Sequence, residues 1–263
     1  MSGSQQTVGR LGDDSAGTGP AAIVTCEHAS NRLPARYRGL GLPASRLDSH
    51  IAWDPGARSV ARRCGGALRC PTYEGRYSRL LIDLNRSPGH RKLIPVTAFG
   101  VPIPGNRRLA ADERLARITR YYDPYRQSVI EKIADLISLS GRCVHLSVHS
   151  FVPVLHGVRR DADIGLLYDP KRTAERMIVS ALAGSLRAHG LIVRLNYPYR
   201  GTADGFTTHC RRLWDDMEYG GIELEINQRL LRRHLHRGTG KLLAESVRGT
   251  LRRETSSSRE GGS

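Results

Sequence analysis

The sequence predicts an α/β protein with a mixed, mostly parallel sheet and helices on both faces. Short apolar runs alternate with segments of helical periodicity, a pattern typical of βαβ units. Three of these runs carry histidines or acids near their ends, where open sheets bind ligands. The expected strands are residues 21–24, 68–72, 77–86, 143–148, 164–168, 191–195 and 221–226. The expected helices are residues 55–63, two helices within 107–139 that a break at Asp123-Pro124 separates, 173–189, and a helix within 242–251.

The 263 residues are enough for one large domain, and no linker composition interrupts the middle of the chain. Residues 1–20 and 252–263 are rich in small and polar side chains, so we expect two disordered tails around a single catalytic domain at 21–251. The chain lacks an apolar run of about 18 residues and an apolar signal-peptide centre, so we expect a cytoplasmic protein with no membrane partner. Its five cysteines are scattered without a CxxC pair, which fits a reduced intracellular protein.

The net charge of +16 comes from 41 Lys and Arg against 25 Asp and Glu. A basic chain can bind nucleic acid or another anion. Here the basic residues are dispersed over the whole length and accompany no nucleic-acid-binding motif. The sequence therefore favours a solvated basic surface over a nucleic-acid partner, and it does not determine the oligomeric state.

The polar residues near the strand ends are those of a hydrolytic metal site. Such a zinc site needs three N or O ligands, an open position for water, and a carboxylate that accepts the water's proton. His28, His149 and an acid from residues 48–54 would supply the ligands. Glu223 or Glu225 would be the base. Because these residues are far apart in the sequence, their spacing alone does not identify the site, and composition and pattern predict a metal hydrolase and nothing narrower.

The segment 46–56 offers several candidates for the third ligand. Asp48 and His50 are two residues apart, so an extended backbone would direct both to one side. Asp54 precedes Pro55, which suits a helix N-cap with proline at the first helical position. Asp54 is therefore equally a cap or a site residue.

From residue 23 to about 231 the chain resembles the N-formylglutamate amidohydrolases. The resemblance rests on six ordered motifs, which are Glu27-His28-Ala29-Ser30-Asn31, Asp48-Ser49-His50 with Trp53-Asp54-Pro55-Gly56-Ala57, Tyr77-Ser78-Arg79 with Asp83-Leu84-Asn85-Arg86, Val148-His149-Ser150-Phe151, Asn196-Tyr197-Pro198-Tyr199 with Asp204-Gly205, and Glu223-Leu224-Glu225-Ile226. The family is similar in fold to the zinc carboxypeptidases, within the phosphorylase/hydrolase-like class. It implies a zinc cofactor and a metal-bound water that attacks an amide.

The resemblance implies His28 and His149 as metal ligands, and we expect Asp48 as the third. His50 and Asp54 remain alternatives for that position. Glu27 would point away from His28 in a strand, so we do not expect it to be a ligand.

The resemblance also implies the catalytic and substrate-binding residues. Glu225 is the expected general base, because Glu223 is one pleat further from the strand end. Asn85 and Arg86 correspond to the Asn-Arg pair with which zinc carboxypeptidases bind the substrate carboxylate. Arg79 would bind a second carboxylate or the developing oxyanion.

Ser30 and Asn196 are further expected substrate-binding residues. The implied substrate is a small acidic N-acyl amino acid similar to N-formylglutamate. Family members assigned to histidine breakdown have Pro-His-Ser-Gly where this chain has Glu27-His28-Ala29-Ser30, which leaves the acyl group and amino acid open. The alternatives are a zinc peptidase or amidase of the same fold, and a non-catalytic anion- or nucleic-acid-binding protein on a hydrolase scaffold.

Overall fold

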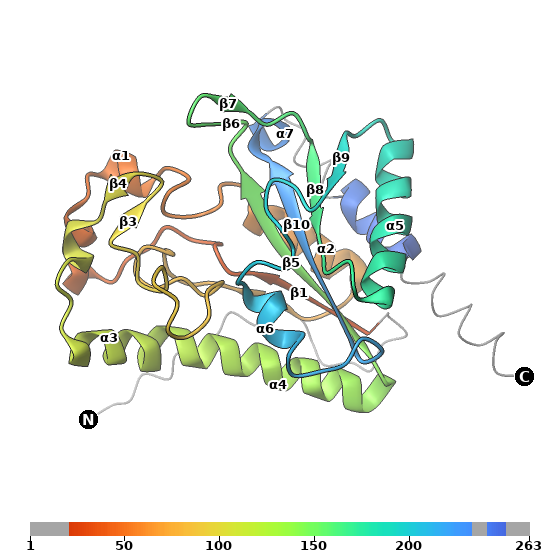
Figure 1. The fold of residues 1–263 in the computed structure, drawn as a ribbon, viewed down its shortest axis with the longest axis horizontal. Coiled ribbons are helices and arrows are strands. Elements are labelled where there is room, and N and C mark those ends of the chain that lie inside the picture. Colours follow the sequence, from red (N-terminus) through yellow and green to blue (C-terminus); the bar gives the residue numbers. More distant parts are fainter. Residues whose placement is uncertain (1–20, 233–240, 251–263) are drawn as a thin grey trace, which may run out of the picture.

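The structure is a computed structural model and describes residues 21–232 and 241–250 (Figure 1). The tails predicted at 1–20 and 252–263 lie outside these residues. No described helix combines the length and the apolar character that crossing a membrane requires.

A six-stranded sheet, in the order β2-β1-β5-β10-β8-β9, forms the centre of the fold. Its strands are β1 (Ala22–Cys26), β2 (Thr72–Glu74), β5 (Cys143–Phe151), β8 (Ile164–Leu167), β9 (Val193–Leu195) and β10 (Tyr219–Asn227). Only β10 and β8 pair antiparallel, and the other four pairings are parallel. The prediction of a mixed, mostly parallel sheet is confirmed. Two short hairpins, β3 (Thr97–Ala98) with β4 (Val101–Pro102) and β6 (Val154–Leu155) with β7 (Val158–Arg159), lie outside this sheet.

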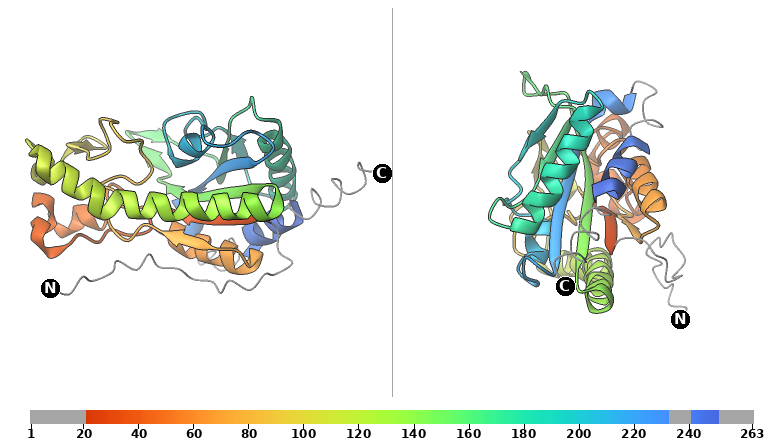
Figure 2. Two further views of the ribbon diagram at one scale, coloured as in Figure 1. Left: turned by 90° about the horizontal axis from the view of Figure 1, so that it is seen from below. Right: turned by 90° about the vertical axis from the view of Figure 1, so that its right-hand side faces the viewer.

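Helices cover both faces of the sheet, as the sequence predicts (Figure 2). The α-helices are α1 (Ala44–Leu47), α2 (Ala57–Leu68), α3 (Ala111–Arg117), α4 (Asp123–Ser140), α5 (Thr173–Ala188), α6 (Phe206–Cys210) and α7 (Gln228–Arg232), and residues 241–250 are also helical. The shorter helical turns are the 3-10 helices Ala35–Gly41 and Pro104–Asn106 and the π-helical turn Ile118–Tyr122. Helices α2, α5 and 241–250 share one hydrophobic core cluster, whereas α4 and α6 contribute to a second.

The strands direct alternate side chains to these two clusters. In β1, Val24 and Cys26 lie in the cluster with α2, and Ile23 lies in the cluster with α4. Strands β1, β5 and β10 are mutually parallel, so their carboxyl ends meet at one edge of the sheet. That edge is where His28, His149 and Glu225 come together.

Two of the predicted strands are wrong. Residues 77–86 form an irregular loop and not a strand, even though their apolar side chains are buried. Their backbone groups bond to side chains of the α3–α4 helix and to other loops, so tertiary contacts replace a β ladder. Residues 68–72 include the end of α2, and the strand there begins only at Thr72.

The predicted break at Asp123-Pro124 is also wrong. Helix α3, the π-helical turn and α4 follow one another without a gap and form one long rod beside the sheet (Figure 2, left). Pro124 lies in the first turn of α4. Its missing N–H is tolerated because the preceding turn already has a different hydrogen-bond pattern.

Candidate active site

A cavity of about 230 Å³ opens at the carboxyl edge of β1, β5 and β10. His28 follows β1, His149 lies near the end of β5, and Glu225 pairs in register with His149 from β10. All three line the cavity. The parallel strands thus bring together residues that are 76 to 197 positions apart in the chain.

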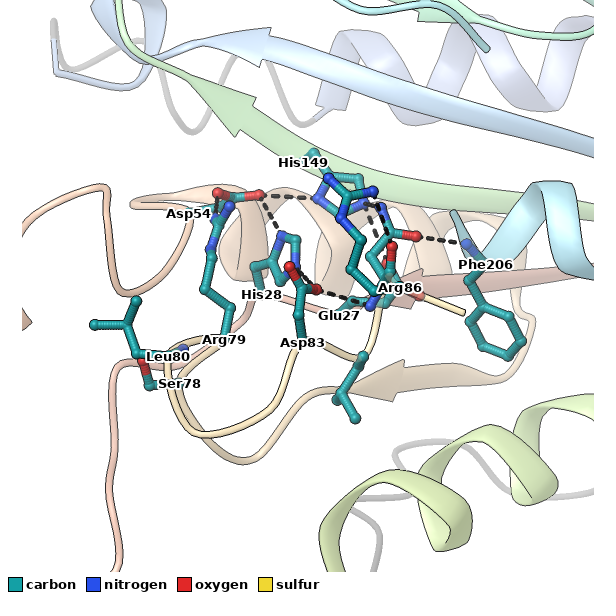
Figure 3. A network of polar contacts seen from close by, with 12 residues as sticks. Glu27, His28, Asp54, Ser78, Arg79, Leu80, Asp83, Arg86, His149 and Phe206 are labelled. Atoms are coloured by element: carbon teal, nitrogen blue, oxygen red, sulfur yellow. Dashed lines mark hydrogen bonds and ion pairs between the residues drawn. The ribbon is translucent and has the colours of Figure 1, made fainter. Parts of the chain in front are cut away.

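His28, Asp54 and His149 form a buried cluster in the cavity (Figure 3). Asp54 Oδ2 lies 2.9 Å from His149 Nδ1 and 3.3 Å from His28 Nδ1. One ligand atom from each of the three residues falls within 4.8 Å of the others. Among the residues that the structure describes, this is the only group of three or more histidines, cysteines and acids with such spacing.

His28 also contacts a second carboxylate through its other ring nitrogen, Nε2. His28 Nε2 lies 2.7 Å from Asp83 Oδ1. Burial, followed by the charge of Arg79, lowers the pKa of His28 to about 4, so its imidazole is neutral at pH 7. A neutral ring that donates from Nε2 to Asp83 has its lone pair on Nδ1, directed toward Asp54. Such a carboxylate behind a histidine is the usual partner of a metal ligand.

His149 has the same arrangement with a different carboxylate. Its Nε2 lies 3.2 Å from Glu27 Oε2, and Glu27 also accepts a 2.7 Å hydrogen bond from Ser147 Oγ. Burial alone would lower the pKa of His149, but the hydrogen bond and charge of Glu27 raise it to about 9. Burial opposes ionisation of Glu27, yet the contact with His149 holds the pKa of Glu27 well below its usual range.

Asp54, rather than Asp48, is the acid that the fold brings to the histidines. The N–H of Asp54 donates to the carbonyl of His28 at 2.9 Å, and this bond holds its turn beside the end of β1. Its side chain makes no cap to α2, whose N-cap residue is Gly56. Asp48 instead follows α1 in a turn, is exposed, and accepts a hydrogen bond from Asn31 Nδ2 at 2.9 Å. The extended backbone expected for residues 48–50 is therefore wrong.

Glu225 and Glu223 lie on the same side of β10, and both line the cavity. Glu223 Oε1 accepts a 2.7 Å hydrogen bond from Thr207 Oγ1, whereas Glu225 Oε2 is buried without a hydrogen-bond partner among the described residues. Burial raises the pKa of Glu225 to about 7, although the charge of His149 opposes this increase. Glu225 is therefore a carboxyl group that can exchange a proton near neutral pH.

The irregular loop 77–86 contributes several side chains to the cavity. Arg79 forms an ion pair with Asp54 (Figure 3). Asn85 Oδ1 accepts a 2.6 Å hydrogen bond from the N–H of Phe206, and its Nδ2 lies 3.3 Å from His149 Nε2. Arg86 lines the cavity, and its Nη1 donates to the carbonyl of Asp204.

Three further cations line the cavity. Lys92, Arg160 and Arg200 line it, and none of them makes an ion pair with a carboxylate in the part of the chain that the structure describes. The guanidinium of Arg160 instead lies 5.8 Å from the ring centre of Phe151 and 5.4 Å from that of Tyr199. The cavity therefore favours a negatively charged ligand.

Comparison with known families agrees with this geometry. Residues 21–232 match the sequence model of the N-formylglutamate amidohydrolase family. The chain belongs to this family. It is therefore an amidohydrolase, as the six motifs predict.

Two solved structures resemble this amidohydrolase over most of its length. A gene product of Agrobacterium tumefaciens is 33% identical, with a TM-score of 0.83, and the match covers 95% of this chain and 97% of that chain. The N-formylglutamate amidohydrolase of Ralstonia eutropha JMP134 is 21% identical, with a TM-score of 0.67 and coverage of 90% and 94%, which shows a shared fold. No curated protein matches the chain.

Two of the expected substrate-binding residues of the amidohydrolase lie away from its cavity. The described residues that line the cavity do not include Ser30 or Asn196. Ser30 Oγ accepts a hydrogen bond from the N–H of Arg32, and Asn196 Oδ1 accepts from the N–H groups of Tyr168 and Gly201. Both side chains thus stabilise local turns.

Sequence reasoning did not assign a role to Asp83, and it set Glu27 aside. Asp83 is the one acid in the segment 77–86, in which apolar residues are mixed with polar ones such as Arg79 and Asn85. An acid in such a segment signals a buried polar partner, which here is His28. Glu27 is not a member of the cluster of His28, Asp54 and His149, but its carboxylate lies 3.2 Å from His149 Nε2.

Proposed function

We propose that this amidohydrolase uses zinc to hydrolyse the amide of a small acidic N-acyl amino acid, with N-formylglutamate as the model substrate. The observation that supports it most is the cluster of His28, Asp54 and His149, in which each histidine has its own carboxylate behind it.

The three residues fit a catalytic zinc site. They supply two nitrogen ligands and one oxygen ligand, the number and type that catalytic zinc takes while one position stays open. Asp83 and Glu27 would hold the ligand rings in orientation. When bound, zinc would polarise the amide carbonyl and lower the pKa of the attacking water.

Glu225 is the proposed general base. Its buried carboxyl has a pKa of about 7, and one of its oxygens has no hydrogen-bond partner in the described part of the chain, so it can accept a proton from water and deliver it to the leaving nitrogen. Glu223 is a poorer candidate because Thr207 already occupies one of its oxygens. Arg79, which its ion pair with Asp54 holds in the cavity, is the proposed donor to the developing oxyanion.

The cavity's charge and size support an acidic and small substrate. Arg86 and Asn85 are the proposed partners of the substrate carboxylate. The cations Lys92, Arg160 and Arg200, which pair with no carboxylate among the described residues, would stabilise further negative charge. A cavity of about 230 Å³ is smaller than the roughly 300–1,000 Å³ typical of sites for drug-sized ligands. This size favours a single N-acyl amino acid over a peptide.

The test starts from protein that has been stripped with a chelator and reloaded with zinc. The reloaded protein is assayed for released amine on N-formylglutamate, N-acetylglutamate, their neutral analogues and short peptides. Zinc-dependent release from the acidic N-acyl amino acids is the expected result. Release from peptides alone would assign the site to a zinc peptidase, and tight zinc binding without any hydrolysis would contradict the proposal.

A further inference from the structure

The loop of residues 79–86 has no regular secondary structure, although it positions several groups of the site. Arg79 contacts Asp54, Asp83 contacts His28, and Asn85 lies beside His149. Placement of such groups to within a fraction of an ångström needs a rigid support. A loop without a β ladder must obtain this support from other side chains.

Three side chains of the α3–α4 rod supply hydrogen bonds to carbonyls of this loop. Arg117 Nη1 donates to Leu81 at 3.1 Å, and Arg126 Nη1 donates to Leu84 at 3.2 Å. The hydroxyl of Tyr122 donates to Arg86 at 2.7 Å. Arg117, Tyr122 and Arg126 are each at most 4% exposed, so water does not offer their polar groups an alternative partner.

The π-helical turn explains how all three side chains reach the same loop. Arg117 and Arg126 are nine residues apart, about two and a half turns of a regular α-helix, which would place them on opposite faces. The turn Ile118–Tyr122 lies between them and widens the helix there. An i to i+5 pattern places Arg117 and Tyr122 on one face, and Arg126 follows one α-helical turn later.

We propose that Arg117, Tyr122 and Arg126 are positioning residues that hold the loop 79–86 in its active arrangement, and that the π-helical turn aligns them for this role. The expected changes in KM, kcat and zinc affinity rest on the proposed function. They differ between the three residues, because each residue holds a different part of the loop. Tyr122 holds the carbonyl of Arg86, the proposed carboxylate-binding residue. Arg126 holds the carbonyl of Leu84, between Asp83 and Asn85, which contact the two histidines.

The first test is Tyr122→Phe, with Tyr121→Phe as its matched control. Phenylalanine keeps the ring of Tyr122, whose centre lies 5.3 Å from the Arg126 guanidinium, and removes only the hydroxyl. Tyr121 belongs to the same π-helical turn, but its ring packs on Tyr37 and Tyr77 instead. We expect Tyr122→Phe to raise KM for an acidic N-acyl amino acid about tenfold, with zinc affinity unchanged and with little effect on the amidated analogue. Tyr121→Phe should change none of these.

The second test compares Arg126→Met with Arg126→Lys. Methionine removes the donor to Leu84, so we expect zinc affinity and kcat to fall about tenfold or more, because Asp83 no longer holds His28 firmly. Lysine can still donate to the carbonyl and should restore part of both. A general loss of stability would affect Arg126→Met and Arg126→Lys alike, and that result would remove Arg126 from the proposal.

Hydrogen exchange of peptides that cover residues 79–86 gives a readout without substrate or metal. Exchange should be faster in Tyr122→Phe and Arg126→Met than in wild type and Tyr121→Phe. The proposal is overturned if exchange is unchanged in both variants, or if it rises while KM and zinc affinity stay at wild-type values. If wild-type protein neither binds zinc nor hydrolyses N-acyl amino acids, the proposed function fails, and exchange alone decides whether the three residues hold the loop.

Discussion

Replacement of Glu225 by glutamine is the sharpest test of the proposed chemistry. The two side chains are nearly equal in size, so the packing of β10 against β5 should survive. The amide, however, cannot accept a proton from water or deliver one to the leaving nitrogen. General acid–base catalysis is typically worth about 100- to 10,000-fold, and we expect a loss of this size in kcat with little change in KM.

The same substitution should stabilise the metal-free protein at alkaline pH. Burial raises the pKa of Glu225 from its ordinary value of 4.5 to about 7 in the folded state. The folded state therefore binds this proton more tightly than the unfolded state, and the resulting stability is fully present below pH 4.5 and lost as the pH rises through 7. Glutamine has no proton to lose. The free energy of unfolding of Glu225→Gln should therefore exceed that of the wild type by about 1 kcal/mol at pH 5 and by about 3 kcal/mol at pH 8.

Both effects can be measured on one preparation with a matched control. Kinetics on zinc-loaded protein give kcat and KM, and urea unfolding of the chelated protein at pH 5 and 8 gives the two free energies. Glu223→Gln is the control, because Glu223 lies on the same face of β10 but accepts a hydrogen bond from Thr207. An active Glu225→Gln with an inactive Glu223→Gln would identify Glu223, and not Glu225, as the general base. Activity in both variants, with zinc bound, would refute the mechanism.

Three further predictions concern the metal and the substrate. Asp54→Ala should reduce the bound zinc measured by elemental analysis, whereas Asp48→Ala should not; equal zinc in both would remove Asp54 from the site. Arg86→Ala should lower kcat/KM for an acidic substrate by roughly 30- to 1,000-fold and spare its amidated analogue, and an equal loss on both substrates would make Arg86 structural. The pKa of about 9 for His149 means that zinc must displace a proton at pH 7. Zinc affinity from calorimetry should therefore increase about tenfold per pH unit from 7 to about 9, and a flat profile would exclude His149 as a ligand.

Local sequence patterns determine the class of the fold and point to two members of the cluster of His28, Asp54 and His149. Alternating apolar runs and helical periods lead to a mostly parallel sheet, and this topology alone brings the carboxyl ends of β1, β5 and β10 together. His28, His149 and Glu225 are therefore recognisable from the sequence as neighbours in space. Their strands are buried over their whole length, so the apolar pattern is strong.

The choice between Asp48 and Asp54 depends on tertiary structure. Both acids lie in one short segment with equally plausible chemistry. The backbone bond from Asp54 to His28 decides which of them turns inward. A hydrogen bond between residues 26 positions apart leaves no trace in hydrophobic periodicity, which reports only neighbours on one helix or strand.

The loop 77–86 shows the same limit of local patterns on a larger scale. Its apolar residues are buried, as in a strand, so their pattern alone predicts one. The path of the backbone there depends on which groups donate hydrogen bonds to its carbonyls. These groups include Arg117, Tyr122 and Arg126, which lie 36 to 42 positions further along the chain than the residues they bond. The sequence thus determines which residues of this amidohydrolase are buried and which have reactive side chains. Long-range hydrogen bonds decide how these side chains are arranged in space, because a hydrogen bond depends on the distance and angle between groups that only the tertiary structure brings together.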